Sequence, residues 1–194
     1  MERASISLLT ICGLEELEGH GSGGVTHVLS ILDPNWPDPP SFETYGPHHR
    51  TLLRFHDIVE DVPGMEPPMP EHVEAILRFG EDLAADAHER SEGHLLIHCH
   101  MGISRSTAAM TMLLAQAYPH EDGEQLVRRL TDIRPQAWPN ARMIGFADKA
   151  LGRGGDLSAA VTRLHARQIA HKPHLAKVMS DLGRAREVEA ALAP

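Results

Sequence analysis

Four short apolar runs alternate along the chain with stretches in which apolar residues recur at three- and four-residue steps. The runs cover residues 5–11, 25–32, 50–55 and 94–98. They show little alternation between apolar and polar positions, which is typical of strands in a sheet covered on both faces. We therefore expect four strands connected largely by helices.

Helical periodicity separates the third run from the fourth, over residues 70–87, with Pro70 in the first turn. Three more helical patterns follow, at 105–118, 121–133 and 140–152. Strands that alternate with helices predict an α/β fold, with a central, mostly parallel sheet flanked by helices.

The last forty residues add extra C-terminal helices. We assign residues 1–155 to one domain and residues 156–194 to a helical extension packed on the same domain. Two helical patterns meet near Pro173, and the second carries an apolar stripe of Leu175, Val178, Met179 and Leu182. Docking of this stripe on the domain is favoured over a dimer contact, although the oligomeric state stays open.

Composition narrows the class of partner. The 194 residues are 42% hydrophobic and 23% charged, with a formal net charge of -9, which argues against a nucleic-acid partner. No apolar stretch approaches the roughly 20 residues that a membrane span needs. The apolar run near the N-terminus lacks the basic start of a secretory signal. We expect a cytoplasmic protein without a membrane partner.

The chemistry is concentrated in "HCHMGISRST", residues 98–107, between the fourth strand and an apolar helix. Ligands of α/β sheets bind at the carboxyl ends of strands, and a helix N-terminus offers unpaired N–H groups. Successive N–H groups in such a loop fit a tetrahedral oxyanion, and an arginine fork binds two of its oxygens. The predicted phosphate-binding residues are His100, Met101, Gly102, Ile103, Ser104 and Arg105.

Cys99 lies at the base of this loop. A free cysteine titrates at ~8.5, and a helix N-terminus with nearby cations lowers that value. We therefore expect a Cys99 thiolate that attacks phosphorus. The hydroxyl of Ser106 is close enough in sequence to stabilise the thiolate, also as a leaving group.

The motif H-C-x5-R-S resembles the signature of the protein-tyrosine phosphatase superfamily. The form H-C-x-x-G-x-S-R-S resembles its dual-specificity branch, with matches at Cys99, Gly102, Ser104, Arg105 and Ser106. A weaker likeness extends over residues 5–152, through "GVTHVLSI" and "IRPQAWPN". The resemblance implies the cysteine-phosphatase fold and hydrolysis of phosphate monoesters through a phosphocysteine intermediate. It implies a phosphorylated protein or a small phosphomonoester as substrate, and no metal or other cofactor.

Three aspartates compete for the role of general acid. In the superfamily that the chain resembles, the acid follows a strand, and one helix then leads to the nucleophile strand. Asp38, in "NWPDPP", does not satisfy this order, because another strand lies between it and the helix. Its proline-rich context predicts a rigid turn. Asp57, at the end of "LLRFHD", satisfies the topology. Asp61 is the second candidate, because the loop after Asp57 is long.

Other functions stay open at this point. A phosphate-binding module would keep the loop and lack turnover. A phosphoinositide phosphatase is less favoured, because His100 is the only basic residue between Cys99 and Arg105. Sulfur transfer or arsenate reduction would need a persulfide-handling loop or a resolving cysteine close by, whereas Cys12, the other cysteine, lies in an apolar run. A metal site at His98, Cys99 and His100 is disfavoured, because neighbouring strand residues point to opposite faces.

Overall fold

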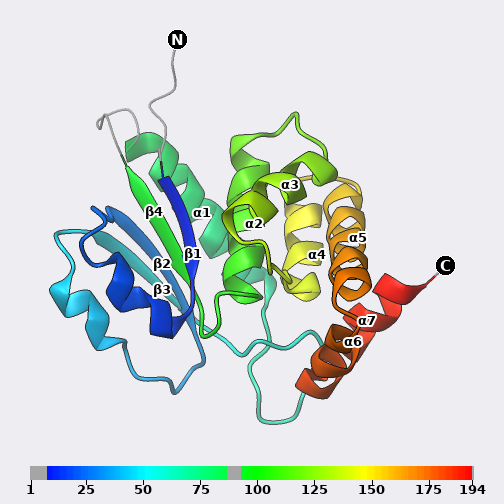
Figure 1. The fold of residues 1–194 in the computed structure, drawn as a ribbon. Helices are drawn as coiled ribbons and strands as arrows, with labels where there is room; N and C mark the ends of the chain where they lie inside the picture. Colours follow the sequence, from blue (N-terminus) through cyan, green and yellow to red (C-terminus); the bar gives the residue numbers. More distant parts are fainter. Residues whose placement is uncertain (1–7, 87–92, 194) are drawn as a thin grey trace.

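The computed structural model describes residues 8–86 and 93–193. At the centre of this described part lies a four-stranded sheet, shown in Figure 1, with strands β1 (Leu8–Cys12), β2 (His27–Leu32), β3 (His49–Arg54) and β4 (His94–His98). The strand order is β1-β4-β2-β3, and every neighbouring pair is parallel. The predicted α/β fold is confirmed. Residues 5–7 of the first predicted strand lie outside the described residues.

The helices follow the predicted order closely. They are α1 (Pro70–Asp86), α2 (Arg105–Ala117), α3 (Gly123–Ile133), α4 (Ala141–Ala150), α5 (Asp156–His171), α6 (His174–Met179) and α7 (Ala185–Leu192). Residue 87, at the end of the predicted first helix, lies outside the described residues. Two short 3-10 helices, η1 (Leu14–His20) and η2 (Pro40–Thr44), were not predicted, because the tighter 3-10 turn lacks the 3.6-residue period.

The two faces of the sheet are covered unequally. On one face, strand residues such as Ile31 and Ile97 join a large core with α1 to α5. On the other face, Val28 and Leu96 join a small core in which Leu17 of η1 is fully buried. The inner strands β2 and β4 are buried along their whole length, which explains the absence of apolar–polar alternation in their sequences.

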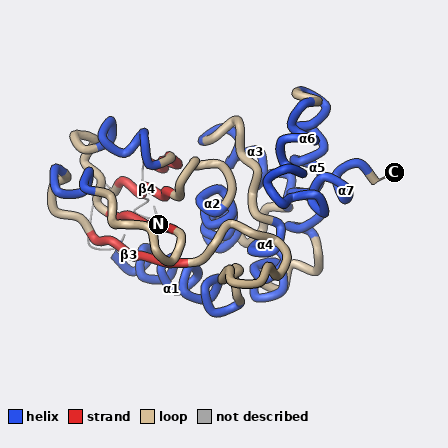
Figure 2. The backbone as a smooth tube through the Cα atoms, turned by 90° about the horizontal axis from the view of Figure 1, so that it is seen from below, coloured by secondary structure: helices blue, strands red, loops and turns tan. Residues whose placement is uncertain are grey.

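The last helices lie on the side of the helical layer away from the sheet, as Figures 1 and 2 show. α5 packs against α3 and α4, and α7 packs against α5. Within the described ranges, no helix has both the length and the apolar character that crossing a membrane requires.

The predicted apolar stripe of the extension is wrong in part. Met179 is buried beside Trp138, but Val178 and Leu182 are 43% and 66% exposed. The segment η3 (Ser180–Arg184) follows α6 and contains a kink that ends the 3.6-residue register of α6. Gly183, with φ 77°, then turns the chain into α7.

Candidate active site

Strand β4 leads directly into the predicted nucleophile. Cys99 follows the last residue of β4 and is buried, and its Sγ lies 3.2 Å from the Oγ of Ser106 in the first turn of α2. Residues 100–104 form the loop between them, which we call the phosphate loop. One short segment therefore brings the thiol, the hydroxyl and the start of a helix together.

Every backbone carbonyl of the phosphate loop, residues 100–104, accepts a hydrogen bond from a neighbouring element. The donors include the amides of Leu14, Ala108 and Trp138 and the side chain of Arg134, at 2.9 to 3.3 Å. The hydroxyl of Thr107 donates to the last two carbonyls, those of Ile103 and Ser104. In a trans peptide the N–H points opposite to the carbonyl. The amides that follow these carbonyls are therefore turned toward the inside of the loop, as an oxyanion site requires.

Two glycines let the phosphate loop lie against the end of β1. Gly102 has φ +66°, and a Cβ on it would lie 2.4 Å from the carbonyl carbon of Cys12. A Cβ on Gly13 would lie 2.9 Å from the carbonyl oxygen of His100. Cys12 itself is fully buried, and burial raises the pKa of its thiol to about 12. The structure thus places Cys12 beneath the loop as a protonated packing residue.

Arg134 fastens the phosphate loop to η1. Its guanidinium donates to the carbonyl of Gly102 at 3.0 Å and to both carboxylate oxygens of Glu16 at 2.9 and 2.8 Å. These hydrogen bonds hold the pKa of Glu16 below its usual value, and Glu16 accepts from the amide of Gly13 at 2.6 Å. Arg134 was not singled out as a site residue, although its place in "IRPQAWPN" was an available signal.

Arg105 is buried, and two acceptors hold one of its terminal nitrogens. Its Nη1 donates to the Asp33 carboxylate and to the Phe55 carbonyl, both at 2.6 Å. Its Nε lies 4.0 Å from Asp57 Oδ2 and has no hydrogen-bond partner among the described residues. Asp33 was missed at the sequence level, although its place directly after β2 puts it at the carboxyl edge of the sheet.

Asp57 lies beside the phosphate loop. Its Oδ1 accepts from Ser104 Oγ at 2.8 Å, from Asn140 Nδ2 at 3.0 Å and from the guanidinium of Arg184. Burial favours the protonated acid, but the charges of Arg184 and Arg105 and the two neutral donors outweigh it, so the pKa of Asp57 lies below its usual value. Arg184 and Asn140 were not predicted from the sequence.

The two rival aspartates are held elsewhere. Asp38 binds Arg54 at 2.9 Å and Arg50 at 3.5 Å. Asp61 binds Arg142 at 2.7 Å, and its side chain is 82% exposed. Of the three aspartates weighed from the sequence, Asp57 is the one that contacts a residue of the phosphate loop.

His100 and Met101 mark the outer side of the phosphate loop. The ring of Trp36 lies 4.3 Å from that of His100, and His100 Nε2 accepts from the amide of Asp33 at 3.2 Å. Met101 is 68% exposed. In the described part of the chain, no three His, Cys, Asp or Glu side chains are grouped to hold a metal ion.

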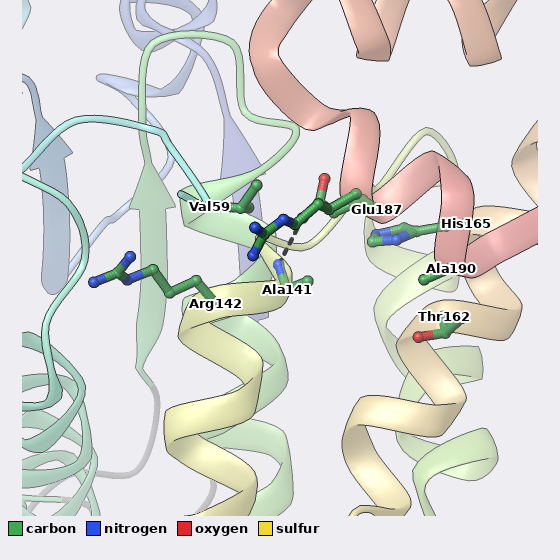
Figure 3. Close-up of a pocket in the computed structure, with 8 residues that line it drawn as sticks. Val59, Ala141, Arg142, Thr162, His165, Glu187 and Ala190 are labelled. Atoms are coloured by element: carbon green, nitrogen blue, oxygen red, sulfur yellow. Dashed lines mark hydrogen bonds between the residues drawn. The ribbon is translucent and has the colours of Figure 1, made fainter. Parts of the chain in front are cut away.

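The C-terminal helices also reach the edge of this site. Figure 3 shows Glu187 of α7 accepting a hydrogen bond from the amide of Ala141, the first residue of α4, at 2.7 Å. A hollow of about 230 Å³ lies beside this contact. Its lining residues are Val59, Ala141, Arg142, Thr162, His165, Arg186, Glu187 and Ala190.

The parallel sheet and the arrangement of its helices define an α/β fold shared with the tyrosine and dual-specificity phosphatases. Human DUSP28 is similar at 17% identity, with a TM-score of 0.57 over 79% of this chain and 96% of that one. The PTP-2 phosphatase of Cydia pomonella gives 16% identity and a TM-score of 0.57, over 76% and 87%. The human tyrosine phosphatase-like serine/threonine/tyrosine-interacting protein gives 16% and 0.54, over 74% and 87%.

No protein-family model matches the chain, and no curated protein matches it in sequence. At these low identities the likeness to solved structures establishes the fold. The chemistry has to be argued from the site itself.

Proposed function

We propose that the protein is a metal-independent cysteine phosphatase that hydrolyses phosphate monoesters through a phosphocysteine. The observation that carries this proposal is the phosphate loop, residues 100–104, whose carbonyls are all bound outward above the thiol of Cys99. Amides turned inward, a helix N-terminus and a buried guanidinium together favour a tetrahedral dianion at this place.

The first step forms a bond between the Cys99 sulfur and phosphorus while the ester P–O bond breaks. Asp57 gives its proton to the leaving oxygen, and Arg105 binds the phosphoryl oxygens through its Nε, for which the described residues supply no acceptor. In the second step water attacks phosphorus, the S–P bond breaks, and a proton of the water returns to Asp57. Ser106, 3.2 Å from the sulfur, stabilises the departing thiolate.

The substrate class is a phosphorylated protein or a small phosphomonoester. Two exposed apolar side chains, Trp36 and Met101, lie next to His100 on the outer side of the phosphate loop. Such side chains suit the ring of an aryl phosphate. His100 is the only basic side chain between Cys99 and Arg105, which makes a polyphosphorylated headgroup a weaker fit.

The decisive experiment compares the two cysteines. Cys99→Ser should abolish hydrolysis of p-nitrophenyl phosphate and of phosphotyrosine peptides, because a hydroxyl is a far weaker nucleophile than a thiolate. Cys12→Ser is the matched control and should keep turnover in whatever fraction of the protein folds. The wild-type protein should retain full activity in excess chelator. Activity that survives Cys99→Ser, or that chelator removes and zinc restores, contradicts the proposal.

One observation favours a second function, a phosphate-binding module without turnover. Asp57 is tied to Arg184 as a carboxylate, and a carboxylate cannot donate the proton that the leaving group needs. Such a module would bind tungstate or a phosphopeptide with measurable heat of binding, while the wild-type protein hydrolysed neither aryl phosphates nor phosphopeptides at any pH. Turnover that depends on Cys99 rejects it.

A further inference from the structure

The extension brings a second buried arginine to the phosphate loop. Arg184 is 3% exposed and follows Gly183, whose positive φ turns the chain toward the site. One terminal nitrogen, Nη2, donates both to Asp57 and to Ser104 Oγ, the latter at 2.5 Å. A residue of the extension thus bridges the predicted acid and the phosphate loop.

Buried groups fix the other side of this guanidinium. Arg184 Nη1 donates to Glu187 at 3.1 Å, and the Glu187 carboxylate also accepts from the Ala141 amide and from Trp138 Nε1, both at 2.7 Å. The ring of Trp138 stacks on that of His165 at 4.2 Å, with 7° between the planes. The contact of Glu187 with Ala141 is drawn in Figure 3. Arg184 is therefore held in one place by α4, α5 and α7.

A purely structural ion pair does not account for this arrangement. Glu187 alone already supplies Arg184 with an opposite charge inside the protein. The second contact is made to Asp57, whose proposed reaction requires the protonated form. A cation at hydrogen-bonding distance favours the carboxylate, so it decides over which pH range the acid is available.

We propose that Arg184 is a positioning residue of the phosphatase site, which fixes the Asp57 carboxyl against Ser104 and controls when this carboxyl holds a proton. The proposal rests on the proposed function. It makes the extension a part of the active centre, with one side chain that acts through Asp57.

The charges that face Asp57 come from three directions. Arg105 at the start of α2 and Arg184 of the extension both favour the carboxylate. Glu187 faces Asp57 from α7, and His100 faces it from the phosphate loop. Without Arg184, burial, which favours the protonated acid, is opposed by one guanidinium fewer. The proton of Asp57 is then kept to a higher pH.

The test is a pH profile of kcat/KM with phosphotyrosine, in which the basic limb reports loss of the acid's proton. In Arg184→Gln this limb should move to higher pH by about one pH unit or more. Arg184→Lys keeps the charge and should keep the limb near its wild-type position. Arg186→Gln is the matched control, because Arg186 lies two residues further along the chain, in α7, and pairs with Glu60. A limb that stays in place in Arg184→Gln overturns the proposal.

A general loosening of the structure would lower kcat in Arg184→Gln and leave the basic limb in place, which also contradicts the proposal. Should Arg184→Gln fail to fold, Arg184→Met, which keeps the aliphatic stem without the charge, takes its place and should show the same shift.

A readout without turnover separates this inference from the proposed function. The full chain is labelled with 13C at the Asp carboxyl carbons, and the Asp57 signal is assigned by its absence in Asp57→Asn. Its titration should move to higher pH in Arg184→Gln and stay unchanged in Arg186→Gln. If the wild-type protein hydrolyses nothing, the proposed function fails, while this titration still supports or rejects control of Asp57 by Arg184.

Discussion

Arg105 shows how much the site depends on the shape of single side chains. Its Nη1 is already held by Asp33 and by the Phe55 carbonyl, so the remaining nitrogens of the fork are fixed in direction. A lysine carries the same charge but offers one point instead of a planar fork.

Arg105→Lys should therefore lower kcat for p-nitrophenyl phosphate by a factor on the order of 10²–10³, the usual effect of losing a donor aimed at developing charge. Steady-state kinetics on the purified variant measure this. Arg50→Lys, outside the phosphate loop, is the control and should stay near wild type. Turnover of Arg105→Lys equal to that of Arg50→Lys would make Arg105 a structural residue only.

Asp57→Asn should lower kcat by roughly 10²–10⁴ for phosphotyrosine, whose leaving group needs a proton. The loss should be much smaller for p-nitrophenyl phosphate, because an acidic phenol leaves without full protonation. Asp38→Asn and Asp61→Asn, whose carboxylates pair with arginines elsewhere, serve as controls on both substrates. If only Asp61→Asn shows a loss that depends on the leaving group, then Asp61 is the general acid and Asp57 is not.

Asp33→Asn tests the unpredicted carboxylate. Its negative charge lies 2.6 Å from the guanidinium that is proposed to bind phosphate, so its removal should make inorganic phosphate a tighter competitive inhibitor. Arg105 would still be oriented by the Phe55 carbonyl. Inhibition constants at constant ionic strength measure the change. Weaker inhibition would mean that Asp33 is needed to hold Arg105 in place.

At the scale of elements, the conformation of the phosphate loop is fixed because neighbouring elements donate hydrogen bonds to its carbonyls. Leu14 belongs to η1, Arg134 follows α3, and Trp138 precedes α4. The loop conformation is thus fixed during folding. Little reorganisation is left for the moment at which a phosphate binds.

Gly102→Ala should destroy this conformation. The new Cβ would meet the Cys12 backbone at 2.4 Å, on a residue that already has a positive φ. Gly64→Ala is the matched control, since Gly64 has φ +79° but open space around its Cβ position. Gly64→Ala should lose about 1–3 kcal/mol of unfolding free energy through strain alone and keep activity. Gly102→Ala should lose more stability and vanadate binding; unchanged vanadate affinity would contradict the close fit.

At the scale of the whole molecule, buried histidines link folding to pH. His98 and His165 are buried, and burial lowers their pKa values from 6.5 to about 4 and about 3. The unfolded chain therefore binds more protons than the folded one below pH 6.5. The stability that these groups contribute is complete above pH 6.5 and is lost as the pH falls toward their folded values.

The free energy of unfolding should accordingly fall with decreasing pH at about 1.4 kcal/mol per pH unit for each such histidine. His165→Phe keeps a ring beside Trp138 and should reduce this slope by one proton, whereas His120→Phe, at an exposed position, should leave it unchanged. Urea unfolding between pH 4 and 7 gives the slopes. Equal slopes in wild type and His165→Phe would contradict this prediction, because they would mean that His165 binds its proton over the same pH range in the folded and the unfolded chain.

Prediction from sequence succeeded where structure is local. Strands β2 and β4 could be predicted from a few consecutive apolar residues. The loop between Cys99 and Arg105 could likewise be predicted from the residues of that segment alone. The position of Asp57 beside the phosphate loop required only the order of strands and helices, and its role as the acid stays a prediction. Arg184 was missed because its contact with Asp57 spans 127 residues and depends on a positive φ at Gly183. The stripe predicted over α6 was wrong in part because a 3.6-residue pattern does not reveal the kink at Gly183.

The separation of Asp57 from Arg184 has a consequence for the chain as it is made. At a synthesis rate of about 5–20 residues per second, ribosomes need about 6 to 25 s to add the 127 residues that follow Asp57 up to Arg184. Strand β4, Cys99 and the phosphate loop are added within this interval, and the carboxyl of Asp57 has no partner from the extension until its end. Under the proposed function, a chain cut by a protease within α6 keeps Cys99, Asp57 and the phosphate loop but loses Arg184, and its basic limb should lie at higher pH than that of the full chain.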